Sequence, residues 1–175
     1  AEVGDAFLAL WGIFPTAVWH GGAKLFGDGF DRDRLEPVTK WLVKDFKRQL
    51  PSVPRAFRRL RRFTSDYSDA YRHIDVYLTS TLGGPTHRLG YLAPDIPGEV
   101  QIARARRQVP TTWVQNAGGG PGLSLPLGRD ADALPLGIHF AADSGAEATL
   151  LSLAFEREEA LPWVTLAAAA GTATT

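Results

Sequence analysis

The sequence predicts an α/β protein in which α-helices cover a mixed β-sheet. Two observations lead to this class. Apolar residues recur at helical spacing through much of the first 110 residues. Short apolar segments bounded by glycine and proline, typical of strands, occur at 75–79, 123–127 and 135–142. A length of 175 residues is enough for a hydrophobic core, so we expect residues 1–175 to form a single domain or part of one.

Composition argues against nucleic-acid and membrane partners. Lys+Arg and Asp+Glu both number 19, so no net charge attracts the chain to nucleic acid or anionic lipid. No apolar run approaches the ~18 to 20 residues that a membrane span needs. Cysteine is absent and no basic-then-apolar signal stands at the start, so we expect a cytoplasmic protein. Methionine is absent too, which indicates processing or a piece of a longer protein.

The helices expected in the first two thirds of the chain are bounded by prolines. They span 3–14, 36–50, 54–74 and 99–109. Pro37 suits a first helical turn, and the prolines at 51 and 54 predict a helical hairpin between the second and third helices. The glycine-rich segment 16–30 and the segment 83–98 are expected to be loops.

The last third of the chain predicts a strand pair followed by a helix. Pro126 cannot donate to a strand ladder, which puts the strand at 123–127 near a sheet edge. The turn at 129–132 leads into the strand at 135–142. Ser144–Glu147 fits a capping box that opens the last helix. That helix is expected to bury Leu150, Leu151, Ala154, Phe155 and Leu161, and residues 167–175 are expected to form a flexible tail.

No single motif supplies a catalytic or metal site. The run Gly118–Gly122 leads into a strand with no Gly-Lys-Ser/Thr, which favours a tight turn over a phosphate loop. Ser124 lies in mid-strand, without the sharp turn that a nucleophilic serine needs. His139 lies within an apolar strand and fits a hydrogen-bonded core residue, and the four histidines form no metal-ligand spacing. The arginines of the helix at 54–74 fit a solvated face.

Four ordered blocks nevertheless resemble the closing part of amidase-signature enzymes. DVYLT at 75–79 is similar to the family's Asp-Val-Leu-Leu-Thr-Pro strand. TWVQNAGGGPGLSLP at 112–126 is similar to its Thr…Asn-x-Thr-Gly-x-Pro-Ala-x-Ser-x-Pro stretch. LPLGI at 134–138 resembles Leu-Pro-x-Gly-Val, and 147–163 resembles the closing Glu…Leu-Leu-x-Leu-Ala…Pro-Trp segment. Residues 24–74 also resemble the preceding helices of bacterial members. The resemblance implies the C-terminal part of the amidase-signature fold.

The resemblance also implies a chemistry and its limits. Family members hydrolyse carboxylic amides with a Ser–cis-Ser–Lys triad and a Gly/Ser-rich oxyanion loop, without metal or cofactor. That machinery lies in the N-terminal part of the family sequence, and no segment here matches the loop, so no catalytic residue is carried over. By position in the blocks, the expected contribution is a wall of the substrate pocket, formed by Thr79, Ser80, Thr112, Trp113 and Asn116.

Several positions depart from the family pattern. Ser80 stands in place of proline, and Thr111 in place of the aromatic residue that precedes the conserved threonine. Gly118 and Gly122 replace threonine and alanine. Arg157 replaces a leucine in the last helix, where burial without a partner would destabilise the fold. These changes affect the pocket lining more than the fold.

Two functional hypotheses follow. The first is an amidase of small-molecule amides, represented here by a C-terminal portion that supplies fold and pocket wall and is inactive alone. The second is a non-catalytic interaction module or a degenerate or truncated amidase fragment. Either form is expected to expose a strand edge and an apolar face, which predicts self-association or a missing N-terminal portion as partner.

Overall fold

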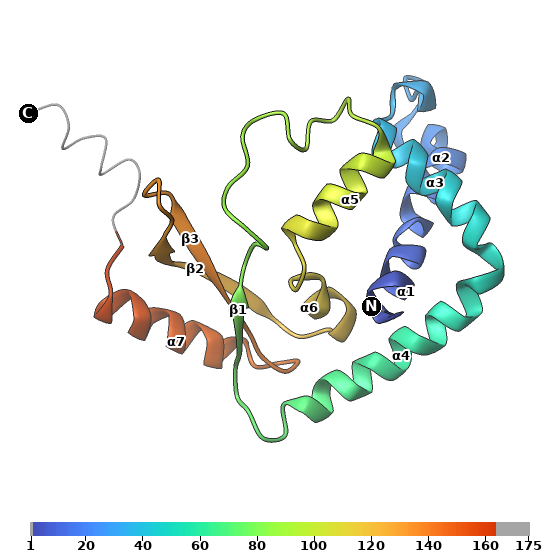
Figure 1. Cartoon of the computed structure of the whole chain (residues 1–175). Helices are drawn as coiled ribbons and strands as arrows, with labels where there is room; N and C mark the ends of the chain where they lie inside the picture. Colours follow the sequence, from blue (N-terminus) through green and yellow to red (C-terminus); the bar gives the residue numbers. More distant parts are fainter. Residues whose placement is uncertain (1, 164–175) are drawn as a thin grey trace, which may run out of the picture.

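The computed structural model describes residues 2–163, which form a helical half and a half built around a small sheet (Figure 1). The helices are α1 (Glu2–Trp11), α2 (Ile13–Phe26), α3 (Pro37–Gln49), α4 (Val53–Ala70), α5 (Gly98–Gln108), α6 (Trp113–Gly118) and α7 (Glu147–Ala160), with 3₁₀ turns η1 (Arg32–Arg34) and η2 (Leu50–Ser52). The strands are β1 (Tyr77–Ser80), β2 (Gly122–Arg129) and β3 (Pro135–Ala141). Helices α1 to α6 form one half, and the sheet with α7 forms the other. The predicted combination of helices and sheet is confirmed, but the sheet of the described residues is antiparallel and not mixed as predicted.

The sheet has the order β1-β3-β2, and both strand pairs are antiparallel. All three strand segments were predicted, as was the hairpin of β2 with β3. Pro126 does lie on an edge strand, and the pairing of β2 with β3 shifts register between Leu125 and Gly128. A residue without an N–H interrupts the ladder at this point, and a bulge absorbs the interruption.

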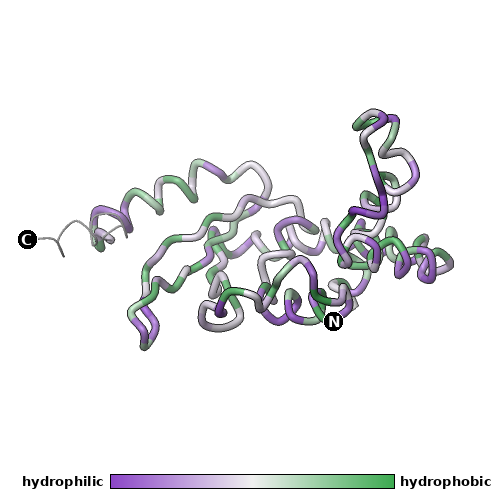
Figure 2. The backbone as a smooth tube through the Cα atoms, turned by 90° about the horizontal axis from the view of Figure 1, so that it is seen from above, coloured by the Kyte–Doolittle hydropathy of each residue, from purple (hydrophilic) through white to green (hydrophobic). Residues whose placement is uncertain are grey.

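One face of the sheet packs against α7, which lies along the strands in the view of Figure 2. Leu150 is the centre of this core and packs with Leu125, Phe140 and Ala142. The inward face of α7 continues with Leu153 and Ala154. These positions lie one helical turn from Leu150, as the ~100° step per residue requires.

The prediction for the apolar face of α7 is partly wrong. Leu151 and Phe155 are 55% and 67% exposed, and Leu161 beyond the helix is also exposed. Leu151 and Phe155 lie about 100° or more around the helix axis from Leu150, so they point away from the sheet. Arg157 is exposed as well, so it causes no burial penalty.

The loop predicted at 16–30 is also wrong, because α2 runs through most of it. Pro15 is tolerated because it falls in the first turn of α2, where an N–H has no partner within the helix. Gly22 sits directly beneath the ring of Phe30, where a Cβ would come within 2.3 Å of ring carbons. Close packing of a returning loop on the helix therefore requires this glycine.

Three local predictions need correction. The capping box does not form: α7 begins after Ala146, without a side-chain cap, and the Asp143 carboxylate accepts from the Ser144 amide instead. Helix α4 ends at Ala70, four residues earlier than predicted. Helix α6 was not predicted at all; Gly119, in the left-handed region at φ 85°, ends it. The tail predicted at 167–175 lies outside the described residues.

The glycine run joins the two halves. A Cβ at Gly118 would come within 2.5 Å of the Tyr67 ring, and one at Gly120 within 2.3 Å of both the Tyr67 hydroxyl and the Ala142 carbonyl oxygen. The Tyr67 hydroxyl donates to that carbonyl at 2.9 Å. A tight turn with close approach, as predicted, is therefore confirmed, and the Tyr67 ring leaves no room for a Cβ at Gly118. No described helix is long and apolar enough to cross a membrane.

Candidate functional site

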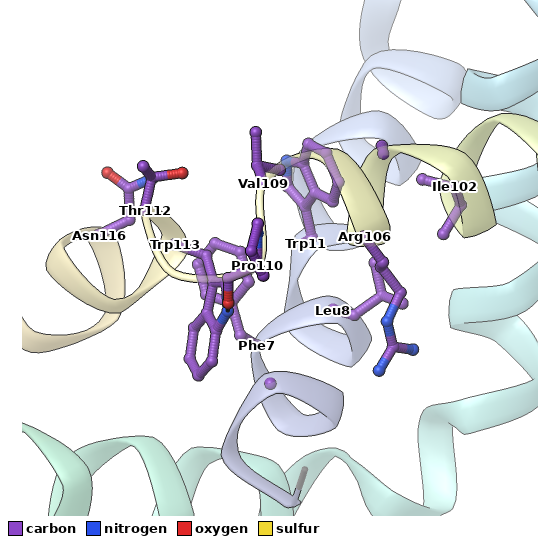
Figure 3. A pocket seen from close by; sticks show the side chains of 12 residues that line it. Phe7, Leu8, Trp11, Ile102, Arg106, Val109, Pro110, Thr112, Trp113 and Asn116 are labelled. Carbon is purple, nitrogen blue, oxygen red and sulfur yellow. Dashed lines mark hydrogen bonds between the residues drawn. The ribbon is translucent and has the colours of Figure 1, made fainter. Parts of the chain in front are cut away.

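A largely apolar pocket of about 420 Å³ lies between α1, α5 and α6 (Figure 3). Its lining comes from three segments that are far apart in sequence. The residues are Gly4, Phe7, Leu8 and Trp11 of α1; Ile102, Ala105, Arg106, Val109 and Pro110 in and after α5; and Thr112, Trp113 and Asn116 in and before α6. Such a concave, aromatic-lined space with few polar groups is typical of a small-molecule site.

The pocket arises from the way α1 packs on α4. Ala6 and Ala9 of α1 are buried against Ala56 of α4, so the two backbones approach closely on this side. Phe7 and Trp11 are one turn apart on a different side of α1, and both face the pocket. Small residues on one side of α1 and large ones on another thus leave the hollow beside α5 and α6.

Trp113 forms the wall on the α6 side and is held in place from several directions. Its Nε1 donates to the Pro110 carbonyl at 2.8 Å. Its ring lies against Phe7 and Phe63, with centroid distances of 5.9 and 6.2 Å. A Cβ on Gly4 would stand 3.3 Å from this ring, so glycine lets α1 approach it closely. A hydrogen-bonded indole in aromatic contacts is a rigid wall for a flat apolar ligand.

Polar groups stand at opposite ends of the pocket. Thr112, just before α6, and Asn116, on α6, lie side by side at one end (Figure 3). At the other end, the Arg106 guanidinium points away from them and pairs with Asp5 at 2.7 Å. Because that charge already has a partner, the free polar groups are the amide of Asn116 and the hydroxyl of Thr112, which suit an uncharged polar ligand group better than an ion.

A chain of polar contacts connects α6 to the sheet. The Thr111 hydroxyl donates to the Ser80 carbonyl at 3.4 Å and lies 3.3 Å from the Thr79 hydroxyl. The Thr79 hydroxyl in turn lies 3.5 Å from Nδ1 of His139. His139 is 6% exposed, and burial lowers its pKa below the usual range because the charged ring would lose its hydration. The neutral ring is thus a core residue with a polar contact, as predicted.

The structure brings together three of the five predicted pocket residues. Thr112, Trp113 and Asn116 line one side of the same cavity. Thr79 and Ser80 are not among the lining residues; they lie on β1 and contact Thr111, the neighbour in sequence of the lining residue Thr112. The role of all five residues as a wall of the substrate pocket remains a prediction. Phe7 and Trp11 were not predicted as site residues, although their spacing of four within the predicted helix at 3–14 was the signal for a shared surface.

Ser124 and His139 share one face of the sheet, but the described contacts do not form a nucleophile and base. They are cross-strand neighbours in register. The Ser124 hydroxyl is 2.6 Å from the Thr81 hydroxyl, and no described hydrogen bond joins it to the imidazole. A Cβ at Gly122 would come within 2.7 Å of Nε2 of His139, so the buried ring leaves no room for a side chain there. Within residues 2–163, no cluster of three or more His, Cys, Asp or Glu side chains fits a metal ion.

Comparison with known proteins places this architecture in a family. The family profile described as "Amidase" matches residues 21–151, most of the chain. AmiC of Mycobacterium leprae (strain TN), which is named provisionally as an amidase, is 42% identical over 159 residues, covering 91% of this chain and 34% of that protein. The 6-aminohexanoate-cyclic-dimer hydrolase of Paenarthrobacter ureafaciens is 45% identical over 96 residues, covering 51% of this chain and 20% of that protein.

The fold has a solved counterpart. A structure of 6-aminohexanoate cyclic dimer hydrolase complexed with substrate superposes with a TM-score of 0.73 at 21% identity, covering 93% of this chain and 36% of that chain. The chain thus spans about a third of the length of the AmiC proteins that it matches. The profile match, the relatives and the shared fold agree, and the chain belongs to the amidase family.

Proposed function

We propose that this chain supplies the C-terminal part of an amide hydrolase and that its pocket receives the apolar group beside the scissile amide. The observation that carries this proposal is the position of Thr112, Trp113 and Asn116. These residues stand in a segment that resembles the amidase motif, and they line the described cavity together. An apolar wall with an uncharged polar end suits an aryl or alkyl amide better than a charged substrate.

The catalytic step belongs to a separate N-terminal portion in this proposal. That portion would contribute the Ser–cis-Ser–Lys triad and the oxyanion loop, so the 175-residue chain alone turns over no amide. Its docking position is the open edge of β1, where Tyr77 and Leu78 are 49% and 57% exposed. A strand with one free side offers unpaired backbone groups to an added strand. We place the enzyme in the cytoplasm, since a chain with no cysteine suits a reducing compartment.

The test is complementation. The chain is purified alone and also co-expressed with the N-terminal two thirds of the Mycobacterium leprae AmiC, and release of the amine from an aryl amide is measured for each. Turnover by the pair but not by the chain supports the proposal. Turnover by the chain alone overturns the assignment of catalysis to a separate portion. A stable pair without turnover on any amide favours the interaction-module hypothesis instead.

The pocket has its own readout. Thr112→Val keeps the shape of the side chain and removes a hydroxyl at the polar end, so the complemented enzyme should show a raised KM for an aryl amide. Thr39→Val makes the same change on α3, away from the cavity lining, and should leave KM unchanged. An equal effect of the two substitutions would contradict the placement of substrate in this pocket.

A further inference from the structure

Two exposed helix faces carry opposite charges beside exposed apolar side chains. The first, the basic face of α4, consists of Arg55, Arg58, Arg61 and Arg62 with Phe57 at its margin. The buried side of α4 carries Ala56 and Tyr67, and the arginines lie roughly opposite them at ~100° per residue. Phe57 is 53% exposed. An aromatic side chain therefore stands uncovered next to a cluster of cations.

The second, the acidic face of α7, consists of Leu151, Phe155, Glu158 and Glu159. Phe155 is 67% exposed, and the two glutamates lie one turn further along on either side of it. Arg157 lies between them in sequence but about 160° around the axis from Phe155, so it does not neutralise this face. The acidic face thus repeats the arrangement of the basic face with the opposite charge.

A single copy of the chain does not bring these faces together. Helix α7 and the arginine-bearing first half of α4 lie at opposite ends of the molecule in Figure 1. Among the described residues, no ion pair reaches Arg58, Arg61, Glu158 or Glu159; the one described pair on either face joins Arg62 to Asp66 within α4. Both faces are therefore available to another molecule.

We propose that the acidic face of α7 in one copy docks on the basic face of α4 in a second copy. Contact between Phe155 and Phe57 would remove two exposed aromatic side chains from water, and the glutamates would meet the arginines around them. The charge balance of the whole chain, 19 basic against 19 acidic residues, conceals this segregation between two helices. Because the two surfaces differ, the contact is head-to-tail and leaves one face open at each end of an assembly.

The first measurement is the mass distribution of the 175-residue chain by sedimentation over a range of concentration and salt. Concentration-dependent association that weakens as salt rises is expected, because salt screens exposed charges. A monomer at every concentration in low salt overturns the proposal. So does association that salt leaves unchanged, which points to the free edge of β1 as the contact instead.

The decisive measurement uses two variants from which the charges of one face are removed. R58Q/R61Q removes two positive charges from the basic face and E158Q/E159Q removes two negative charges from the acidic face, and each variant alone should associate at least about tenfold more weakly than the parent chain. All four residues are exposed, and unchanged circular dichroism and thermal unfolding would verify that both variants fold. Mixed in equal amounts, the two variants retain one intact face each and should form a dimer that grows no further.

The mixing result separates head-to-tail docking from every other contact. Variants that associate as strongly as the parent overturn the proposal. Variants that fail alone and also fail to dimerise when mixed overturn the head-to-tail geometry. Because amide turnover is not measured, neither outcome depends on whether the chain is part of an amidase.

Discussion

The sheet half and the helical half of this molecule reach their packing in different ways. In the sheet half, Leu150 of α7 meets Phe140 and Leu125 in one apolar cluster, and α7 covers the strands. In the helical half, the buried residues between α1 and α4 are the alanines Ala6, Ala9 and Ala56. Leu10 of α1 packs against these alanines, whereas Phe7, Leu8 and Trp11 point elsewhere and line the 420 Å³ pocket.

This difference shows where a binding site can form in a small fold. Large apolar residues fill the space between a helix and a sheet, because their side chains meet in the middle. Alanines draw two helices together instead, so the aromatic residues of α1 are left to enclose a space with α5 and α6. We call the sheet half closed, because its apolar side chains fill the space between α7 and the strands. We call the helical half open, because it contains the pocket that can receive a ligand.

The largest expected effect on stability comes from removing a core side chain of the closed half. Leu150→Ala removes a side chain that is 2% exposed, and should lower the free energy of unfolding by about 2–5 kcal/mol through lost burial and a residual cavity. Leu151→Ala, its neighbour at 55% exposure, is the matched control and should cost less than about 1 kcal/mol. Urea unfolding measures both. Equal losses would mean that α7 does not face the sheet as described.

The next effect tests the junction between the halves. Gly120→Ala places a Cβ 2.3 Å from the Ala142 carbonyl oxygen and the Tyr67 hydroxyl, so it should cost about 1–3 kcal/mol by overpacking. Gly21→Ala in α2 meets no atom within 4 Å and should stabilise by up to about 1 kcal/mol. Thermal unfolding of the two variants should move in opposite directions. A harmless Gly120→Ala would refute the close contact.

A smaller effect concerns the pH dependence of stability, which we expect to come from the sheet half. Burial in the sheet lowers the pKa of His139 below its usual 6.5, so the unfolded chain takes up a proton at mildly acidic pH that the folded chain does not. Stability is then complete above about pH 6.5 and falls as the pH drops, by up to ~1.4 kcal/mol per pH unit. His139→Gln should remove this slope and His20→Gln, on exposed α2, should keep it. Urea midpoints of the parent chain and both variants, measured between pH 8 and 5, test this prediction. A slope that persists in His139→Gln would contradict it.

The smallest effect concerns the open half. Arg106 and Asp5 tie α5 to α1 at the pocket rim, but both side chains are more than half exposed. A double-mutant cycle with Arg106→Ala and Asp5→Ala should give a coupling of about 0.2–1 kcal/mol that declines in high salt. A coupling well above this range would mean that the pair is shielded from water and that the pocket is more closed than described.

Sequence reasoning succeeded where contacts are local. The strands β2 and β3 are joined by a short turn, so alternation and turn residues predict both their existence and their pairing. The same holds for α3, whose bounds follow from Pro37 and the proline after it. The pairing of β1 with β3 links Tyr77 to Ala141, and no local pattern encodes a contact across such a separation.

The walls of the pocket formed by α1 and α5 escaped prediction for the same reason. Phe7 and Trp113 meet only because α1 and α6 are brought together by packing on α4. The local sequence of neither segment predicts this contact. Local signals also misled where tertiary contacts override them. Gly22 reads as a helix breaker, yet the Phe30 ring packed on it explains a glycine inside α2. Ser144 and Glu147 have capping-box spacing, but the Ser144 amide donates its hydrogen bond to the Asp143 carboxylate instead.

The contact of Tyr67 with Ala142 gives the molecule a built-in optical reporter. The Tyr71 hydroxyl donates to that of Tyr67 at 3.2 Å, and burial raises the pKa of Tyr71 well above its usual value. Alkaline titration followed by near-ultraviolet absorbance should therefore show this phenol ionising at a higher pH than an exposed tyrosine. The absorbance of Tyr71 would thus report, without any label, whether its buried contact with Tyr67 is intact.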